Sequence, residues 1–380
     1  MNNRNTPQIY DFTIVGQGLA GSILAYELLK YNKTVLVIDD NHKSASSSMA
    51  AGIINPITGM RFVKTSHVEI LLPAALTLYH QLEKILKTPL LHHTQMIRLL
   101  HNRKEAEQLE KRIQDPAYHH WLGQYHPANT LAKFNDEFGS IDQLQSSWLD
   151  VPQCLSAIRH WLQSCNPTTT TYLQGTIDDA NIKIIKSRQG NIIRLQSLQD
   201  EKIQPVNTHS LIYCRGYKDQ FNHFFKWLPF QCAKGEILSL RANKALPPTL
   251  VNFGQWLIPI DPFTIKTGAS WDRESLNQEI TAKARIMLLN KIKVLYNIPG
   301  LEFEVIDQQA GVRPCTKHRT PFIGSHPEIE SIKIFNGFGA KGSLLVPYFA
   351  KEFAKELCHT TSDKQTLLTE CDIKRYWHGN

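Results

Sequence analysis

The chain has 380 residues, of which 42% are hydrophobic and 20% are charged, and this length allows two domains or one large domain with an insertion. The composition excludes an intrinsically disordered, collagen-like or coiled-coil chain. The 42 basic and 34 acidic side chains leave a net charge of +8, which favours an anionic cofactor, substrate or nucleic acid without identifying one.

The cysteine and hydropathy patterns indicate a cytoplasmic protein. The seven cysteines are odd in number and include no CxxC pair, so they predict neither a disulfide framework nor a zinc site. The paired histidines at 92–93 and 119–120 lack metal-ligand spacing, and we expect no bound metal. The longest uncharged stretch near the start, residues 12–26, is too short to span a bilayer, so we expect no signal peptide and no membrane anchor.

Residues 12–40 predict a complete βαβ unit, with an apolar strand, a glycine turn, an amphipathic helix and a second strand that ends in acid. In the turn, Gly16 would allow a tight bend, Gly18 would let the backbone approach a pyrophosphate, and Gly21 would permit close contact between helix and strand. The helix N-terminus would supply N–H groups for the phosphates. The unit therefore predicts a dinucleotide-binding site.

An acid stands at the tip of the second predicted strand. Asp39 lies where a carboxylate can accept hydrogen bonds from the ribose of a dinucleotide, and Asp40 is the alternative. The next segment, residues 44–61, is a small-residue loop followed by a short apolar strand and a turn. Its hydroxyls and amides would hold phosphate, unless it is a flexible surface loop. The cofactor contacts expected from this segment come from Ser47, Ser48, Ala51 and Gly52.

The middle of the chain predicts helices and then short strands. Residues 68–86 and 103–113 predict helices, and we interpret the charges of the second helix as a solvated face. Short strands are favoured at 172–240 and 255–269, before a helix at about 278–295. This order predicts a discontinuous cofactor domain around an inserted substrate domain. The expected cofactor domain comprises residues 1–80, 150–228 and 305–375, and the substrate domain comprises 81–149 and 229–304.

A second GxGxxG turn stands near the end of the chain, at Gly337, Gly339 and Gly342. It follows an apolar strand and opens a helix with apolar residues at every fourth position. No second strand with a terminal acid follows, so we expect the helix N-terminus to face an electron-rich part of the cofactor bound by the first turn. A simple tight turn is the alternative.

These features together resemble the D-amino-acid oxidase (DAO) superfamily of FAD enzymes, which includes glycine oxidase and the FAD domain of tRNA wobble-uridine modification enzymes. The resemblance rests on GQGLAG, Asp39, the SSSMAAGIINP loop, and the late GVRP, PFIG and GFGAKG elements. It implies a mixed α/β fold, with a Rossmann-like FAD domain of the glutathione-reductase type and a substrate domain on a mixed or antiparallel sheet. It also implies non-covalent FAD and oxidation of an amine carbon, with hydride transfer to the flavin and hydrolysis of the resulting imine.

The resemblance assigns roles to two basic residues. Arg313, in GVRP, matches the arginine that forks onto a substrate carboxylate, although a structural ion pair is the alternative. Lys341, in the late glycine turn, would stabilise negative charge on the reduced flavin, unless it is a solvated surface lysine. Arg61 is a position-based candidate for a second positive group beside the substrate.

Two departures from the family pattern leave three functions open. Ala340 stands where glycine oxidases have an arginine, and His318 replaces a common acid. The first hypothesis is an FAD-dependent oxidase or dehydrogenase of a small amino acid or N-substituted glycine. The second is a tRNA-modifying enzyme that removes a carboxymethyl group from a wobble-uridine amine, and the third is a non-catalytic flavin-binding protein. The expected partner is a small-molecule amine or amino acid, or tRNA under the second hypothesis, and no oligomeric state is predicted.

Overall fold

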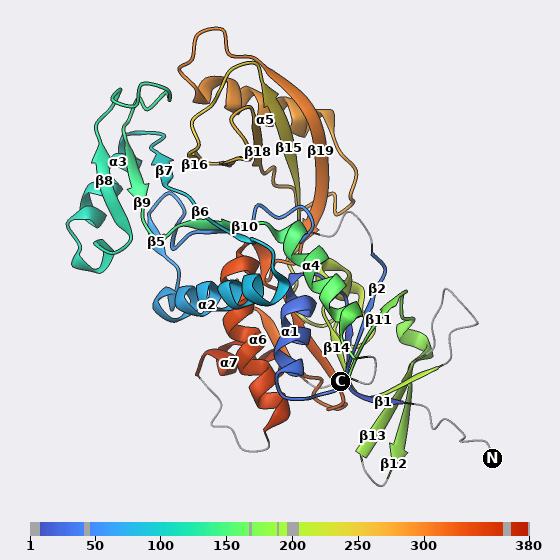
Figure 1. The fold of residues 1–380 in the computed structure, drawn as a ribbon. Helices are drawn as coiled ribbons and strands as arrows, with labels where there is room; N and C mark the ends of the chain where they lie inside the picture. Colours follow the sequence, from blue (N-terminus) through green and yellow to red (C-terminus); the bar gives the residue numbers. More distant parts are fainter. Residues whose placement is uncertain are drawn as a thin grey trace. The chain divides into compact units, whose positions relative to one another are not determined.

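The computed structural model contains two compact units, each assembled from separate stretches of the chain (Figure 1). Unit 1 comprises Met1–Ser48, Pro152–Cys232 and Arg313–Asn380, and unit 2 comprises Met49–Val151 and Ala233–Val312. The residues that the structure describes are 8–41, 46–166, 169–187, 190–195, 205–359 and 366–378. Unit 1 therefore combines segments from both ends of the chain, on either side of long insertions.

The unit boundaries differ from the expected domain boundaries chiefly at residues 49–80 and 305–312. The sequence pattern placed these residues in the cofactor domain, whereas they belong to unit 2. There, strand β3 (Ile53–Ile54) pairs with β10 (Ser147–Leu149), and Leu149 N donates a 3.0 Å hydrogen bond to Gly52 O. Pairing between segments so far apart leaves no local sequence signal. The assignment of cofactor to one unit and substrate to the other stays a prediction.

Unit 1 is built around a mixed sheet. Its strands are β1 (Ile9–Val15), β2 (Val35–Asp39), β11 (Thr170–Gln174), β12 (Lys183–Ser187), β13 (Gly190–Leu195), β14 (Val206–Tyr213), β20 (Phe322–Ser325) and β21 (Ile332–Asn336). Its helices are α1 (Leu19–Leu29), α4 (Val151–Ser164), α6 (Gly342–Cys358) and α7 (Thr366–Cys371). The strand order is β11-β2-β1-β14-β13-β12, with β21 paired to β14 and β20 paired to β21. Strands β11, β2, β1, β14 and β21 run parallel.

Helix α1 is buried on almost every side, which differs from the amphipathic helix expected. It contacts β1, β2 and β21 of the sheet as well as α6, so little of it meets solvent. Ile23, Leu24 and Leu28 are fully buried. An all-round apolar sequence is the pattern of a helix enclosed by other elements. The predicted βαβ connection itself is confirmed.

The parallel strands bring their carboxyl ends to one edge of the sheet. β1 ends just before Gly16, β2 ends at Asp39, β14 ends just before Cys214 and β21 ends just before Gly337. In open α/β sheets, ligands bind at this edge. The fold of unit 1 thus collects residues from three distant parts of the chain at one place.

Unit 2 contains a large mixed sheet with the order β19-β15-β18-β17-β16-β7-β9-β8, a small sheet β3-β10-β6 and a hairpin β4-β5. Beyond β3 and β10, the strands are β4 (Ile57–Thr58), β5 (Val63–Lys64), β6 (Leu91–His93), β7 (Met96–Leu99), β8 (Leu122–His126), β9 (Ser140–Gln143), β15 (Ala233–Ala242), β16 (Leu250–Asn252), β17 (Trp256–Pro259), β18 (Thr264–Gly268) and β19 (Phe303–Arg313). The helices are α2 (Val68–Leu86), α3 (Arg103–Ile113) and α5 (Ala282–Leu295).

The predicted helices of unit 2 are present. Helices α2 and α3 have the expected bounds. Helix α5 begins later than expected because Thr281 caps it, with its Oγ1 accepting a 3.1 Å hydrogen bond from Ala284 N. In the described part of the whole chain, no helix is long and apolar enough to cross a membrane.

One charged residue of α3 is buried, contrary to the expectation of a solvated face. Glu105 is 2% exposed and pairs with Arg98, which is 3% exposed. Arg98 also lies over the Phe62 ring at 4.1 Å and donates a 2.8 Å hydrogen bond to Gly59 O. Although burial favours the neutral acid, His101 and Arg98 lower the pKa of Glu105 to about 2. The pair therefore fixes the hairpin turn at Gly59 to helix α3.

Replacing Glu105→Gln should lower the free energy of unfolding by about 3 kcal/mol, because it leaves the buried Arg98 cation without its carboxylate. The contribution of Glu105 is present above its unfolded pKa near 4.5 and is lost as the pH falls towards 2. Urea denaturation should therefore show a smaller difference between variant and wild type at about pH 3 than at about pH 7.

Glu107→Gln, in the same helix, is the matched control. Its carboxylate is half-exposed and pairs with the exposed Arg103, so the change in stability should stay below about 0.5 kcal/mol. Equal losses in the two variants would contradict a special role for Glu105.

Candidate functional site

The first glycine turn, between β1 and α1, has no room for side chains at two positions. Gly16 has a φ of +101°, and a Cβ there would lie 2.6 Å from Cys214 O. A Cβ on Gly21 would lie 1.9 Å from Gly16 O. At Gly18, a Cβ would lie 3.1 Å from Ser47 Oγ. The turn thus combines a left-handed bend with a close approach of the helix, as the dinucleotide-binding fingerprint requires.

The N-terminus of α1 is suited to a phosphate. Its first turn holds no acidic residue, so the positive end of the helix dipole is not cancelled. Ser47 Oγ accepts a 3.2 Å hydrogen bond from Leu19 N, which places the predicted serine loop at this helix end. Ser48 follows in the same turn of the chain. The structure therefore brings Ser47 to the predicted pyrophosphate position.

Three other predicted site residues belong to unit 2. Ala51 packs beside an apolar cluster, and Gly52 has a φ of +70°, with a Cβ position 1.9 Å from Leu149 O. Arg61 is exposed at the tip of the β4-β5 hairpin. Their cofactor and substrate contacts stay predictions. Residues 44–45, at the start of the expected loop, lie outside the described residues.

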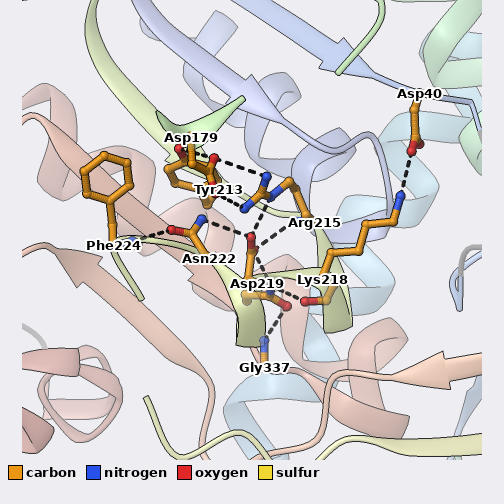
Figure 2. Close-up of polar contacts among 11 residues, drawn as sticks. Asp40, Asp179, Tyr213, Arg215, Lys218, Asp219, Asn222, Phe224 and Gly337 are labelled. Carbon is orange, nitrogen blue, oxygen red and sulfur yellow. Dashed lines mark hydrogen bonds and ion pairs between the residues drawn. The ribbon is translucent and has the colours of Figure 1, made fainter. Parts of the chain in front are cut away.

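The acids at the end of β2 both lie close to basic side chains. Asp39 Oδ2 accepts a 2.7 Å hydrogen bond from Gln17 N in the glycine turn, and Asp39 Oδ1 lies 3.7 Å from Arg159 Nη2. Asp40 Oδ2 lies 2.6 Å from Lys218 Nζ (Figure 2). Both acids therefore have a cationic neighbour, and Asp39 is the one that also contacts the glycine turn, where a ribose acceptor is expected.

The late glycine turn follows β21 and leads into α6. Gly337 has a φ of +84°, and a Cβ there would lie 2.8 Å from Thr316 Cγ2. Gly339 has a φ of +55°, and its N donates a 3.3 Å hydrogen bond to Pro314 O. Gly342 is the first residue of α6, which packs against α1. The helices that follow the two glycine turns are therefore neighbours.

A buried carboxylate holds the late glycine turn. Asp219, in the short 3-10 helix η3 (Gly216–Phe221), is fully buried. It accepts hydrogen bonds from Arg215 Nε at 2.8 Å and from Asn336 Nδ2 at 2.7 Å. Asn336 Oδ1 in turn accepts a 2.7 Å hydrogen bond from Gly337 N. Figure 2 shows Asp219 between Arg215 and the backbone of Gly337.

Arg215 extends this network to the first glycine turn. Its guanidinium also pairs with Asp179 at 2.9 Å, and Tyr213 OH donates to the same carboxylate at 2.8 Å. Although burial opposes the charge, Asp219 and Asp179 raise the pKa of Arg215. The Arg215 Cα lies 3.1 Å from the Cβ position of Gly16. One arginine therefore contacts the first turn directly and reaches the late turn through Asp219.

The two candidate catalytic residues lie on connected segments of unit 1. Arg313 ends β19 at the start of the last segment, and Lys341 ends the single-turn helix η4 (Gly339–Lys341). The hydrogen bond from Gly339 N to Pro314 O joins these segments. Burial lowers the pKa of both Arg313 and Lys341. Lys341 is thus partly buried rather than fully solvated, and the roles of both residues stay predictions.

Sequence reasoning missed Arg159, Lys218 and Asp219. Asp219 follows the strand SLIY closely, and an acid just after a buried strand at the ligand edge is a usable signal. Arg159 lies in α4, where nothing in the local pattern relates it to Asp39. Among the described residues, no three histidine, cysteine or acidic side chains form a group that could hold a metal, and no disulfide joins any of the seven cysteines.

Asp219→Asn should lower the free energy of unfolding by about 3 kcal/mol, because it removes the charge that stabilises Arg215 in a buried position. It should also loosen the late glycine turn, since an asparagine side chain has one accepting oxygen where Asp219 accepts hydrogen bonds on two. Urea denaturation measures the first effect, and amide hydrogen exchange at Gly337 measures the second. Asp307→Asn, at an exposed position of β19, should change stability by less than about 0.5 kcal/mol. Unchanged protection at Gly337 would show that Asn336 holds the turn unaided.

Comparison with known proteins agrees with this geometry. A family model described as "DAO: FAD dependent oxidoreductase" matches residues 11–356. Glycine oxidase from Geobacillus kaustophilus has a similar crystal structure, with a TM-score of 0.78 and 19% identity over 97% of this chain and 99% of that one. At this identity the likeness establishes the fold, including the mixed α/β class.

Two curated relatives show sequence similarity over part of their length. Glycine oxidase from Bacillus licheniformis is 32% identical over 120 residues, 31% of this chain and 32% of that protein. The tRNA 5-methylaminomethyl-2-thiouridine biosynthesis bifunctional protein MnmC from Legionella pneumophila (strain Corby) is 23% identical over 350 residues. That match covers 87% of this chain but only 49% of MnmC, so the chain spans about half of that relative. The family match covers most of the chain, which therefore belongs to the DAO family of FAD-dependent oxidoreductases.

Proposed function

We propose that this enzyme oxidises the C–N bond of a small amino acid or an N-substituted glycine. The observation that carries the proposal is the placement of Arg313. The 3.3 Å hydrogen bond between Gly339 N and Pro314 O joins its segment to the glycine turn that bears Lys341. A cation for the substrate carboxylate and a cation for the reduced cofactor are then held on connected backbone.

The residues of unit 1 fit FAD held without a covalent bond. Gly16 and Gly21 leave room only for backbone, the acid-free N-terminus of α1 suits the pyrophosphate, and the Asp39 carboxylate suits the adenosine ribose. When bound, FAD accepts two electrons from the substrate. Lys341 and the N-terminus of α6 supply positive charge for the reduced cofactor.

Arg313 positions the substrate in this proposal. Its planar fork binds a carboxylate through two parallel hydrogen bonds, which fixes the orientation of the neighbouring carbon. That carbon loses a hydride, the nitrogen loses a proton, and water hydrolyses the imine to a carbonyl compound and an amine. Burial of Arg313 strengthens its attraction for an anion because the charge is already removed from bulk water.

The alternative is removal of a carboxymethyl group from a wobble-uridine amine in tRNA. The similarity to MnmC over 87% of the chain and the net charge of +8 favour it. Such a substrate also contains a glycine-like unit, so Arg313 would have the same role. We infer a cytoplasmic location under either alternative, supported by seven cysteines that form no disulfide.

Anaerobic mixing with glycine, sarcosine and D-amino acids should bleach the yellow flavin absorbance if small amines are the substrates. Bleaching by tRNA that carries the carboxymethylaminomethyl group, and by none of the small amines, would select the alternative. A flavin that no member of the panel reduces would favour a non-catalytic flavin-binding protein. Unmodified tRNA is the control for non-specific binding.

Arg313→Lys should raise KM for a substrate found in that panel by about 10-fold or more, because lysine cannot copy the two-pronged carboxylate contact. Flavin content and its visible spectrum should be retained, and steady-state kinetics with absorbance spectra measure both. Arg103→Lys, at an exposed arginine of unit 2, should leave KM unchanged. Wild-type kinetics in Arg313→Lys would remove this residue from the substrate site.

A further inference from the structure

The glycine turn of unit 1 is attached to a helix that the dinucleotide-binding fingerprint does not include. Gln17, between the first two glycines, is 2% exposed. Its Nε2 donates a 3.1 Å hydrogen bond to Leu155 O of α4, and its Oε1 accepts a 2.6 Å hydrogen bond from Arg159 Nε of the same helix. A buried amide with partners on both of its ends has one orientation. Helix α4 therefore fixes the side chain at the centre of the turn.

The same guanidinium reaches the end of β2. Arg159 Nη1 donates to Asn41 Oδ1, and Arg159 Nη2 lies 3.7 Å from Asp39 Oδ1. Its planar group also lies over the Tyr172 ring, 5.3 Å from the centroid, on the strand that pairs with β2. The arginine side chain is 25% exposed and that of Asp39 is 12% exposed, so solvent screens the pair only in part. Stacking and several donors together limit the guanidinium to one place.

We propose that Arg159 is a positioning residue of the dinucleotide site, which sets the affinity for the adenosine ribose by orienting the Asp39 carboxylate and the Gln17 side chain. Asp39 already accepts from Gln17 N on one oxygen. Its other oxygen accepts a 2.8 Å hydrogen bond from Asn41 N and lies beside the Arg159 cation, so contacts on both oxygens fix the orientation of the carboxylate toward a ribose hydroxyl. The cation also reduces the repulsion between this carboxylate and the pyrophosphate. The inference rests on the assignment of Asp39 to the ribose.

The test uses the full-length protein freed of flavin, titrated with FAD, ADP and FMN. Arg159→Gln should weaken the binding of FAD and of ADP by about 10-fold each, because a hydrogen-bonded charge is lost beside the ribose acceptor. FMN has no adenosine and should bind with unchanged affinity. Arg159→Lys keeps the charge but not the planar guanidinium. Its affinity for FAD and ADP should lie between those of the wild type and Arg159→Gln. Flavin fluorescence follows FAD and FMN, and calorimetry follows ADP.

Two further measurements separate positioning from a general structural role. The wild type should bind 2′-deoxy-ADP more weakly than ADP, because the ligand has lost its 2′-hydroxyl. This loss of affinity should be smaller in Arg159→Gln. An equal cost in both proteins would overturn the proposal, because Arg159 would then act independently of Asp39. If Arg159→Gln lost affinity for FMN and ADP equally, the proposal would also be overturned, since the substitution would then disturb the whole of unit 1.

Arg103→Gln, at an exposed arginine of unit 2, is the matched control and should bind all three ligands like the wild type. Unchanged ADP affinity in Arg159→Gln would overturn the inference while leaving the FAD site intact. Failure of the wild type itself to bind FAD or ADP would instead remove the cofactor site on which the inference rests. The two failures are therefore distinguishable.

Discussion

The arrangement of unit 1 depends on one buried carboxylate. Asp219 is removed from solvent, and such a charge is tolerated only where donors surround it. Its donors come from separate parts of the chain, Arg215 after β14 and Asn336 at the end of β21. Because each donor adjoins a glycine turn, satisfying this single charge also fixes the distance between the two turns. The contacts that stabilise the buried Asp219 therefore also position the two glycine turns at the edge of the sheet where a ligand would bind.

Much of unit 1 follows from local pattern, because its determinants are local. The left-handed bend at Gly16, the close approach at Gly21 and the acid at Asp39 each depend on residues within one βαβ unit. Their positions at the edge of a parallel sheet follow from the direction of the strands. The same holds for helices α2 and α3 of unit 2. Their bounds were predicted as observed, because helical periodicity is a property of neighbouring residues.

What the sequence did not predict depends on contacts between distant segments. Residues 49–80 belong to unit 2 through pairing of β3 with β10, and no local feature of β3 selects that partner. The charge run of α3 contains a buried acid because Arg98, on another strand, meets Glu105. Periodicity reports which residues share a face, but not which neighbour covers it. Site residues of this kind, such as Arg159, become visible only once the chain is folded.

Four basic side chains of unit 1 have two kinds of surroundings. Arg159 and Lys218 lie beside the two acids at the end of β2, so each of these carboxylates has a cation next to it. Arg313 and Lys341 differ, because burial lowers their pKa values, so an anion beside either residue would stabilise its charged form. The first pair of cations therefore neutralises charge that the protein already holds, whereas the second pair would be stabilised by an anion that binds beside it, as the proposed function requires of Arg313 and Lys341.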